Sequence, residues 1–211
     1  SGSQVLVASA TPQLYALKVS GTLTFTNWTT CVSARSIVVK NGATVTCAGP
    51  FNDTFDMSNR VWFAASEAFA LESGAKINVN ELGYGTATNV ITTGSGYGPG
   101  KTSWDGGASY GGCSFNKNPY GNAAAPLDPG TSGGSMSAKQ HFWAGGGAVY
   151  IDCPNAMVTI NGSITSDGHA GGDWSHGPST GGAVYIRTKR FKSSGATITA
   201  KGGNRAGRAS S

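Results

Sequence analysis

The chain has 211 residues, of which 38% are apolar and only 12% are charged, and it contains 33 glycines. This length supports one sizeable hydrophobic core in a single domain, and no apolar run approaches the ~18 residues of a membrane-spanning helix, which excludes an integral helical membrane protein. The net charge is +5, with seven of the 15 basic residues after residue 186 and no acidic residue beyond Asp173.

The N-terminal part of the chain alternates apolar and polar residues over short runs. Leu17 and Val19, then Leu23 and Phe25, repeat with the period of two that is typical of half-buried strands. Turn signals such as Asn41-Gly42 separate these runs and favour tight corners over helical crossovers. We therefore expect β-strands throughout this part of the chain.

Residues 61–80 admit two interpretations. The portion from Ala64 to Glu72 has the composition of a short helix, whereas Phe63, Phe69 and Leu71 fit the alternation of a strand. The alternation favours the strand, with a bend near Gly74.

Glycine becomes dense and apolar periodicity disappears between residues 83 and 147. A structureless stretch of this length is unusual inside a compact domain, so it is either packed down by its aromatic side chains or mobile. Its many aromatic residues favour ordered packing.

The C-terminal part contains an internal repeat. The hexapeptide Gly-Gly-Ala-Val-Tyr-Ile begins at Gly146 and recurs at Gly181, a spacing of 35 residues. Periods of 20 to 50 residues mark solenoids, in which each unit stacks its apolar side on the next. One shared core is then expected to contain Val149, Ile151, Val158, Ile160, Val184, Ile186 and Ile198.

A family resemblance covers roughly residues 80 to 205. The succession Gly-Tyr-Gly-Pro-Gly, Gly-Ala-Ser-Tyr-Gly-Gly, Gly-Thr-Ser-Gly-Gly and Gly-Gly-Gly-Ala-Val-Tyr-Ile resembles the glycine-rich modules of large, mostly uncharacterised extracellular surface proteins. The resemblance implies an all-β fold, a right-handed parallel β-helix of pectin-lyase-like shape, and brings no catalytic residues. The expected organisation is one β-solenoid domain over residues 1–211, with N-terminal strands at 1–80, a glycine- and aromatic-rich loop region at 81–146 and repeat rungs at 147–211.

The cysteines and glycosylation sequons favour a secreted, extracellular protein. Three acceptor sequons begin at Asn27, Asn52 and Asn161. The cysteines are Cys31, Cys47, Cys113 and Cys153. They allow three pairings into two disulfides, of which Cys31 with Cys47 is favoured because these two are close in sequence; buried free thiols are the alternative.

One loop between the repeats gathers potential metal ligands. His169, Asp173 and His176 lie within eight residues of one another, but their spacing matches no common metal signature. We therefore expect no metal and no cofactor, with Ca²⁺ as the alternative.

Two functions compete for this sequence. Binding of a glycan would use exposed aromatic rings, with Trp104, Tyr110, Trp143 and Trp174 as candidates, although the same rings can instead form the cores of loops. The enzymatic alternative is a polysaccharide lyase acting on an acidic glycan. It would use Arg187, Lys189, Asp152 and Asp167.

Solenoid ends expose unpaired strand edges, which predicts stacking on another copy or on a neighbouring domain. The chain is then either a piece of a longer protein or a subunit that polymerises. The basic C-terminal end could contact an acidic glycan, an anionic surface or the acidic face of a neighbouring subunit, or simply be a solvated tail. Without a reading motif it does not predict contact with nucleic acid. The expected function is that of an extracellular structural or adhesive module that assembles into a surface fibre and contacts glycans.

Overall fold

The computed structural model describes residues 4–6, 14–52, 57–85, 96–102, 106–112, 118–134, 143–171 and 177–204. Within these ranges all regular secondary structure is β-strand, which confirms the all-β prediction. The strands form two sheets, and every pairing between neighbouring strands is parallel.

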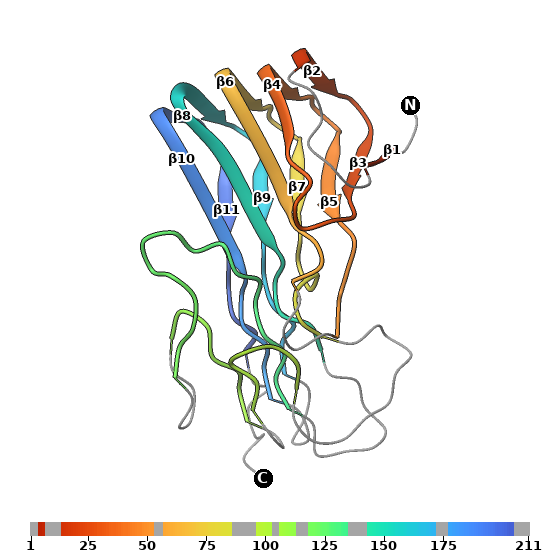
Figure 1. Cartoon of the computed structure of the whole chain (residues 1–211), viewed down its shortest axis with the longest axis vertical. Coiled ribbons are helices and arrows are strands. Elements are labelled where there is room, and N and C mark those ends of the chain that lie inside the picture. The colour runs from red at the N-terminus through yellow and green to blue at the C-terminus, as the bar shows by residue number, and fades with distance from the viewer. Residues whose placement is uncertain are drawn as a thin grey trace.

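The first sheet has five strands in the order β10-β8-β6-β4-β2 and faces the viewer in Figure 1. Its members are β2 (Leu14–Val19), β4 (Val32–Val39), β6 (Val61–Leu71), β8 (Ala148–Ile160) and β10 (Ala183–Ser193). The strand at β6 confirms the choice of strand over helix for this segment.

The second sheet has six short strands in the order β1-β3-β5-β7-β9-β11 and lies behind the first. Its members are β1 (Gln4–Leu6), β3 (Thr22–Phe25), β5 (Thr44–Cys47), β7 (Lys76–Asn78), β9 (Ser163–Thr165) and β11 (Thr197–Thr199). The chain alternates between the two sheets with each successive strand.

The core lies between the sheets and is built from the inward positions of each strand. Phe63 packs edge-on against Phe25 with ring centroids 5.3 Å apart and lies 5.5 Å from Phe69. Val149 and Ile151 of the repeat are buried as predicted, because parallel in-register strands stack equivalent side chains. Val184 and Ile186 pack against this core but are only partly buried, and Ile198 is 42% exposed on the edge strand of its sheet.

Register shifts cross the five-stranded sheet at one level. They fall after Ala34 in β4, after Ala64 in β6 and after Thr188 in β10. Each shift adds residues that cannot pair, so pairs such as Pro154 and Asn155 of β8 both point outward and are exposed. The shifts lie between β4 and β10, whereas β2 pairs with β4 without one. Pro154 and Asn155 rise from the outer face of β8, and we call these two side chains the ridge.

The glycine-rich connections gather at one end of the strands (Figure 1). Their extended segments form what we call the glycine bundle, which consists of residues 83–85, 130–134, 144–147, 166–169, 177–182 and 200–203. Segment 83–85 donates backbone hydrogen bonds to Gly145 and to Gly130, on two different neighbours, and Gly130 donates in turn to Gly146. Hydrogen bonds therefore run in several directions, whereas a sheet restricts them to one plane.

Backbone contact, more than aromatic packing, orders this region. A Cβ atom at Gly83 would lie 2.7 Å from the carbonyl oxygen of Gly130, and one at Gly130 would lie 2.5 Å from that of Gly181. No side chain fits such spaces, so glycine is required sterically. Tyr84 supplies one aromatic anchor, buried with its ring 4.8 Å from that of Phe51.

Candidate functional site

Three aromatic rings stack across the outer face of the five-stranded sheet. Trp62 pairs in register with Tyr150, which pairs with Tyr185 of the repeat. Their ring centroids are 5.7 and 5.4 Å apart, with interplanar angles of 24° and 21°. Because neighbouring strands are ~4.8 Å apart, side chains of equal register must touch, and flat rings do so by stacking.

Arg60 extends this aromatic row beyond Trp62. Its guanidinium carbon lies 4.3 Å from the Trp62 ring centroid and 4.6 Å from that of Trp28, and its Nε donates a 2.8 Å hydrogen bond to the Trp28 carbonyl oxygen. The side chain is buried, and this burial lowers the pKa of Arg60. Among the described residues, no carboxylate lies within ion-pair distance of it.

An ion pair lies one register step from the aromatic row. Asp152 pairs with Ala64 on one side and with Arg187 on the other, and its Oδ1 is 2.8 Å from the Arg187 Nε. The two atoms attract by charge, although they are not aligned as a hydrogen bond. Burial, then the charge of Asp152 and a hydrogen bond to its carboxylate, raise the pKa of Tyr150 to about 12. Tyr150 is therefore a neutral hydroxyl near neutral pH.

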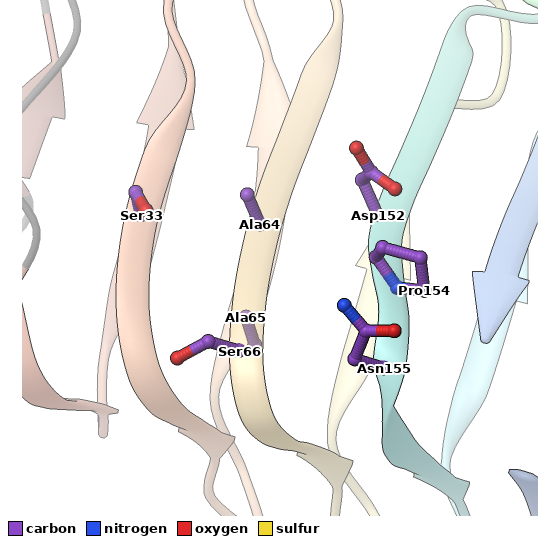
Figure 2. Close-up of a pocket in the computed structure, with 7 residues that line it drawn as sticks. All are labelled: Ser33, Ala64, Ala65, Ser66, Asp152, Pro154 and Asn155. Atoms are coloured by element: carbon purple, nitrogen blue, oxygen red, sulfur yellow. The ribbon is translucent and has the colours of Figure 1, made fainter. Parts of the chain in front are cut away.

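An open groove lies beside the aromatic row, on the side of the ridge. It has a volume of about 220 Å³ and is lined by Ser33, Ala64, Ala65, Ser66, Asp152, Pro154 and Asn155. Figure 2 shows the side chains of Asp152, Pro154 and Asn155 rising from β8, while β6 contributes the small residues between β8 and β4. The groove exists because Ala64 is short where its neighbours in register are longer.

The structure brings together only two of the four candidate residues for a lyase. Asp152 and Arg187 meet as an ion pair, and Lys189 lies exposed at the register shift of β10. Asp167 follows β9 in the other sheet, where its carboxylate accepts hydrogen bonds from the backbone of Lys201 at 2.7 Å and the hydroxyl of Thr199 at 3.0 Å. These contacts give Asp167 a structural role at a turn.

The predicted glycan-binding aromatics pack elsewhere. Tyr110 lies 4.8 Å from Tyr120 between ring centroids, and burial is the main cause that raises its pKa to about 12. Trp143 stacks on His169 at 3.9 Å and 13°. Trp104 and Trp174 lie outside the described residues. Two of the four therefore serve loop packing.

The loop that gathers potential metal ligands is partly described. The Nδ1 atom of His169 lies 2.9 Å from a carboxylate oxygen of Glu81, while Asp173 and His176 lie outside the described residues. In the part of the chain that the structure describes, no three potential ligands come together as a metal site.

The favoured disulfide between Cys31 and Cys47 is wrong. Cys31, Cys47 and Cys153 form no disulfide with one another, and Cys113 lies outside the described residues. Cys47 is buried in the core at the end of β5. Cys31 directly precedes β4, and because its neighbour Val32 points into the core, Cys31 points outward. Closeness in sequence was misleading because one cysteine faces the core and the other faces away from it.

The three sequon asparagines differ in their surroundings. The Asn27 side chain accepts hydrogen bonds from Thr29, and that of Asn161 accepts one of 3.0 Å from the Ser194 backbone. Asn52 is exposed. In the described chain, no helix is long and apolar enough to cross a membrane.

Sequence reasoning missed Trp28, Arg60 and Trp62. The two tyrosines of the aromatic row could have been found, because the hexapeptide repeat places Tyr150 and Tyr185 at equivalent outward positions.

Comparisons with protein-family models, with curated proteins and with solved structures found no match.

Proposed function

We propose that the chain is a right-handed parallel β-helix module of an extracellular structural or adhesive protein, and that it binds an acidic glycan on the outer face of its five-stranded sheet. Two observations support a β-helix. Successive strands alternate between the two sheets, and each strand pairs in parallel with the strands two positions before and after it in the chain. Right-handedness is supported by the strong general preference for right-handed parallel crossovers.

The observation that carries the glycan proposal is the groove over Ala64 beside the aromatic row. The row of Trp62, Tyr150 and Tyr185 gives a rigid apolar wall with hydroxyl tips, and the groove is lined by the hydroxyl and amide groups of Ser66 and Asn155. Sugars present both apolar CH faces and hydroxyls, so they suit a site with these two chemistries.

The charges around the groove favour an acidic ligand. Among the described residues, Arg60 and Lys189 form no ion pair, and Arg187 pairs with one carboxylate, that of Asp152. Three cations are therefore balanced by one carboxylate. The net positive field attracts a polyanion and raises its local concentration.

The geometry does not favour the lyase alternative. A lyase needs a base near neutral pH, but Arg187 is engaged in an ion pair with Asp152, and Tyr150 keeps its proton because its pKa is raised to about 12. Lys189 lies on the edge strand β10, at the register shift, and forms no ion pair with any described residue.

A glycan-binding assay tests the proposal. Titration calorimetry with polygalacturonate, with a sulfated glycosaminoglycan and with neutral dextran is expected to show binding of an acidic chain only, weakening as salt is added. Trp62→Ala should weaken this binding at least about tenfold, or ~1.4 kcal/mol, because it removes the first ring of the wall. Lys189→Ala should reduce the dependence on salt.

Matched variants control for general effects. Tyr15→Ala removes a ring from β2 that is 76% exposed, and Lys76→Ala removes a cation from the other sheet. Both should bind like the wild type. Failure to bind any acidic glycan, or equal losses in Trp62→Ala and Tyr15→Ala, would overturn the proposal.

A further inference from the structure

Within the described residues, the turn formed by β10 and β11, which we call the last turn, leaves inward side chains uncovered. Phe191 of β10 pairs with Val158, which is fully buried, yet Phe191 is 49% exposed. Ile198 of β11 pairs with fully buried Ile164 and is 42% exposed. Both strands are the last in their sheets, so their outer edges offer backbone groups to a further strand.

A groove in the glycine bundle continues this open edge. It has a volume of about 350 Å³ and is lined by Gly107, Ala108, Tyr110, Gly111, Gly112, Pro178, Ser179, Thr180, Gly181, Gly182, Ala200, Gly202 and Gly203. Gly182 directly precedes β10 and Ala200 directly follows β11. One continuous track therefore runs from the groove along the two edge strands.

Three glycines of this groove have no steric requirement for glycine that the described residues impose. A Cβ atom at Gly111 or Gly112 would meet nothing within 4 Å, and one at Gly202 would meet nothing closer than 3.6 Å. Within the described chain, their backbone groups make no backbone hydrogen bond. Elsewhere in the bundle glycine stands where another backbone approaches, so an approaching external backbone explains these three in the same way.

The basic residues of the last turn favour an acidic binding partner. Basic residues crowd the exposed edge at Lys189, Arg190, Lys192 and Lys201. The first turns of this chain offer no complement, because no acidic residue precedes Asp53. The connection after β3, from Thr26 to Thr30, also lacks glycine, so a second copy stacked there would bring side chains to the glycine groove.

We infer that this edge binds an extended strand that residues 1–211 do not supply, either from this chain or from a second copy, in which a glycine-rich segment enters the groove and leads into alternating apolar and acidic residues. Main-chain hydrogen bonds to β10 or β11 extend the sheet. The apolar side chains cover Phe191 or Ile198, and the acidic side chains face the basic residues of the last turn. The inference is independent of the glycan proposal.

Fluorescence anisotropy with synthetic peptides tests the inference on the full chain. The probe is a labelled peptide in which a diglycine leads into alternating valine and glutamate; its controls carry lysine in place of glutamate, or N-methylated backbone amides. We expect only the first to bind. Gly112→Leu and Gly202→Leu should fold normally, since both sites have room for a side chain, and should weaken binding at least about tenfold.

Two further variants separate the outcomes. Ser20→Leu places the same side chain at an exposed turn near the other end and should bind the peptide normally, as should Trp62→Ala on the glycan-binding face. Absence of binding, or equal binding of the N-methylated peptide, overturns the inference. Self-association in sedimentation velocity that Gly112→Leu abolishes would also overturn it, because the occupant would then be a second copy.

Discussion

The guanidinium of Arg60 illustrates how this molecule holds a cation without a nearby carboxylate among its described residues. Two indole rings contact it, and one backbone carbonyl accepts its Nε proton. Each such ring contact contributes ~0.5–2 kcal/mol, more when the cation is removed from water. A planar guanidinium suits this position between two rings, whereas a lysine ammonium would lack both the flat shape and the directed Nε donor.

Gly146 and Gly112 differ in the space around them, which predicts unequal effects of the same substitution. In Gly146→Ala the new Cβ would overlap the Ser166 carbonyl oxygen and lie 2.5 Å from the Gly182 nitrogen. We expect a loss of more than about 3 kcal/mol in the free energy of unfolding, measured with urea. Gly112→Ala, with open space around it, should change this free energy by less than about 0.5 kcal/mol. Equal losses in the two variants would contradict the account of the bundle.

At the scale of the strands, alternation was sufficient to predict the N-terminal strands and β6. Side chains on a strand alternate strictly, so Phe63, Phe69 and Leu71 revealed a buried side despite the helix-like alanines. The register shifts were not predictable, because they depend on how three or more strands are aligned. The groove and its ridge arise from these shifts, so most of the candidate site was hidden from sequence reasoning.

The pairing of β8 with β10 predicts a change in a tyrosine pKa. Asp152→Asn removes the negative charge beside Tyr150, leaving burial as the main cause that keeps its pKa above the ordinary value of 10.0. The pKa of Tyr150 should fall from about 12 toward 10.0, also because Arg187 loses its counter-charge. Ultraviolet titration measures it, with Tyr150→Phe identifying the signal. Asp167→Asn, in the other sheet, should leave this pKa unchanged; an equal shift there would contradict the assignment.

At the scale of the whole molecule, the buried thiols of Cys47 and Cys153 should make the free energy of unfolding depend on pH in the alkaline range. Burial is the main cause that raises the pKa of Cys47 from 9.0 to about 12 and that of Cys153 to about 11. The unfolded chain loses these protons at a lower pH than the folded chain does. The stabilisation by the neutral thiols is therefore complete below about pH 9 and is lost as the pH rises through the raised values.

We expect the free energy of unfolding to fall above pH 9 by up to about 1.4 kcal/mol per pH unit for each thiol. Guanidinium denaturation between about pH 7 and 11 measures this. The double variant Cys47→Ala, Cys153→Ala should be less stable at neutral pH, because it loses core packing, and should show a flatter decline. Parallel declines for the two proteins would show that other groups control alkaline unfolding.

The fold could be predicted from the sequence better than the candidate site could. Alternation and the hexapeptide repeat indicated stacked strands with Val149 and Ile151 in one core, as observed. The failure at Ile198 has a simple cause: a repeat predicts which residues point inward, but not that β11 is the edge strand of its sheet among the described residues. The contact between Trp62 and Arg60 could not be predicted, because neither residue belongs to the hexapeptide repeat.

The glycine bundle reverses the usual relation between strands and connections. In most proteins loops tolerate replacement and carry the variable binding residues, while the strands are constrained by the core. Here a single added carbon at most of the bundle's glycines meets other segments at once, so the described segments of the glycine bundle leave little room for substitution. Freedom to change remains on the outward positions of the strands and on the open edge, and a programme to alter what this scaffold recognises would begin there and leave the glycine bundle untouched.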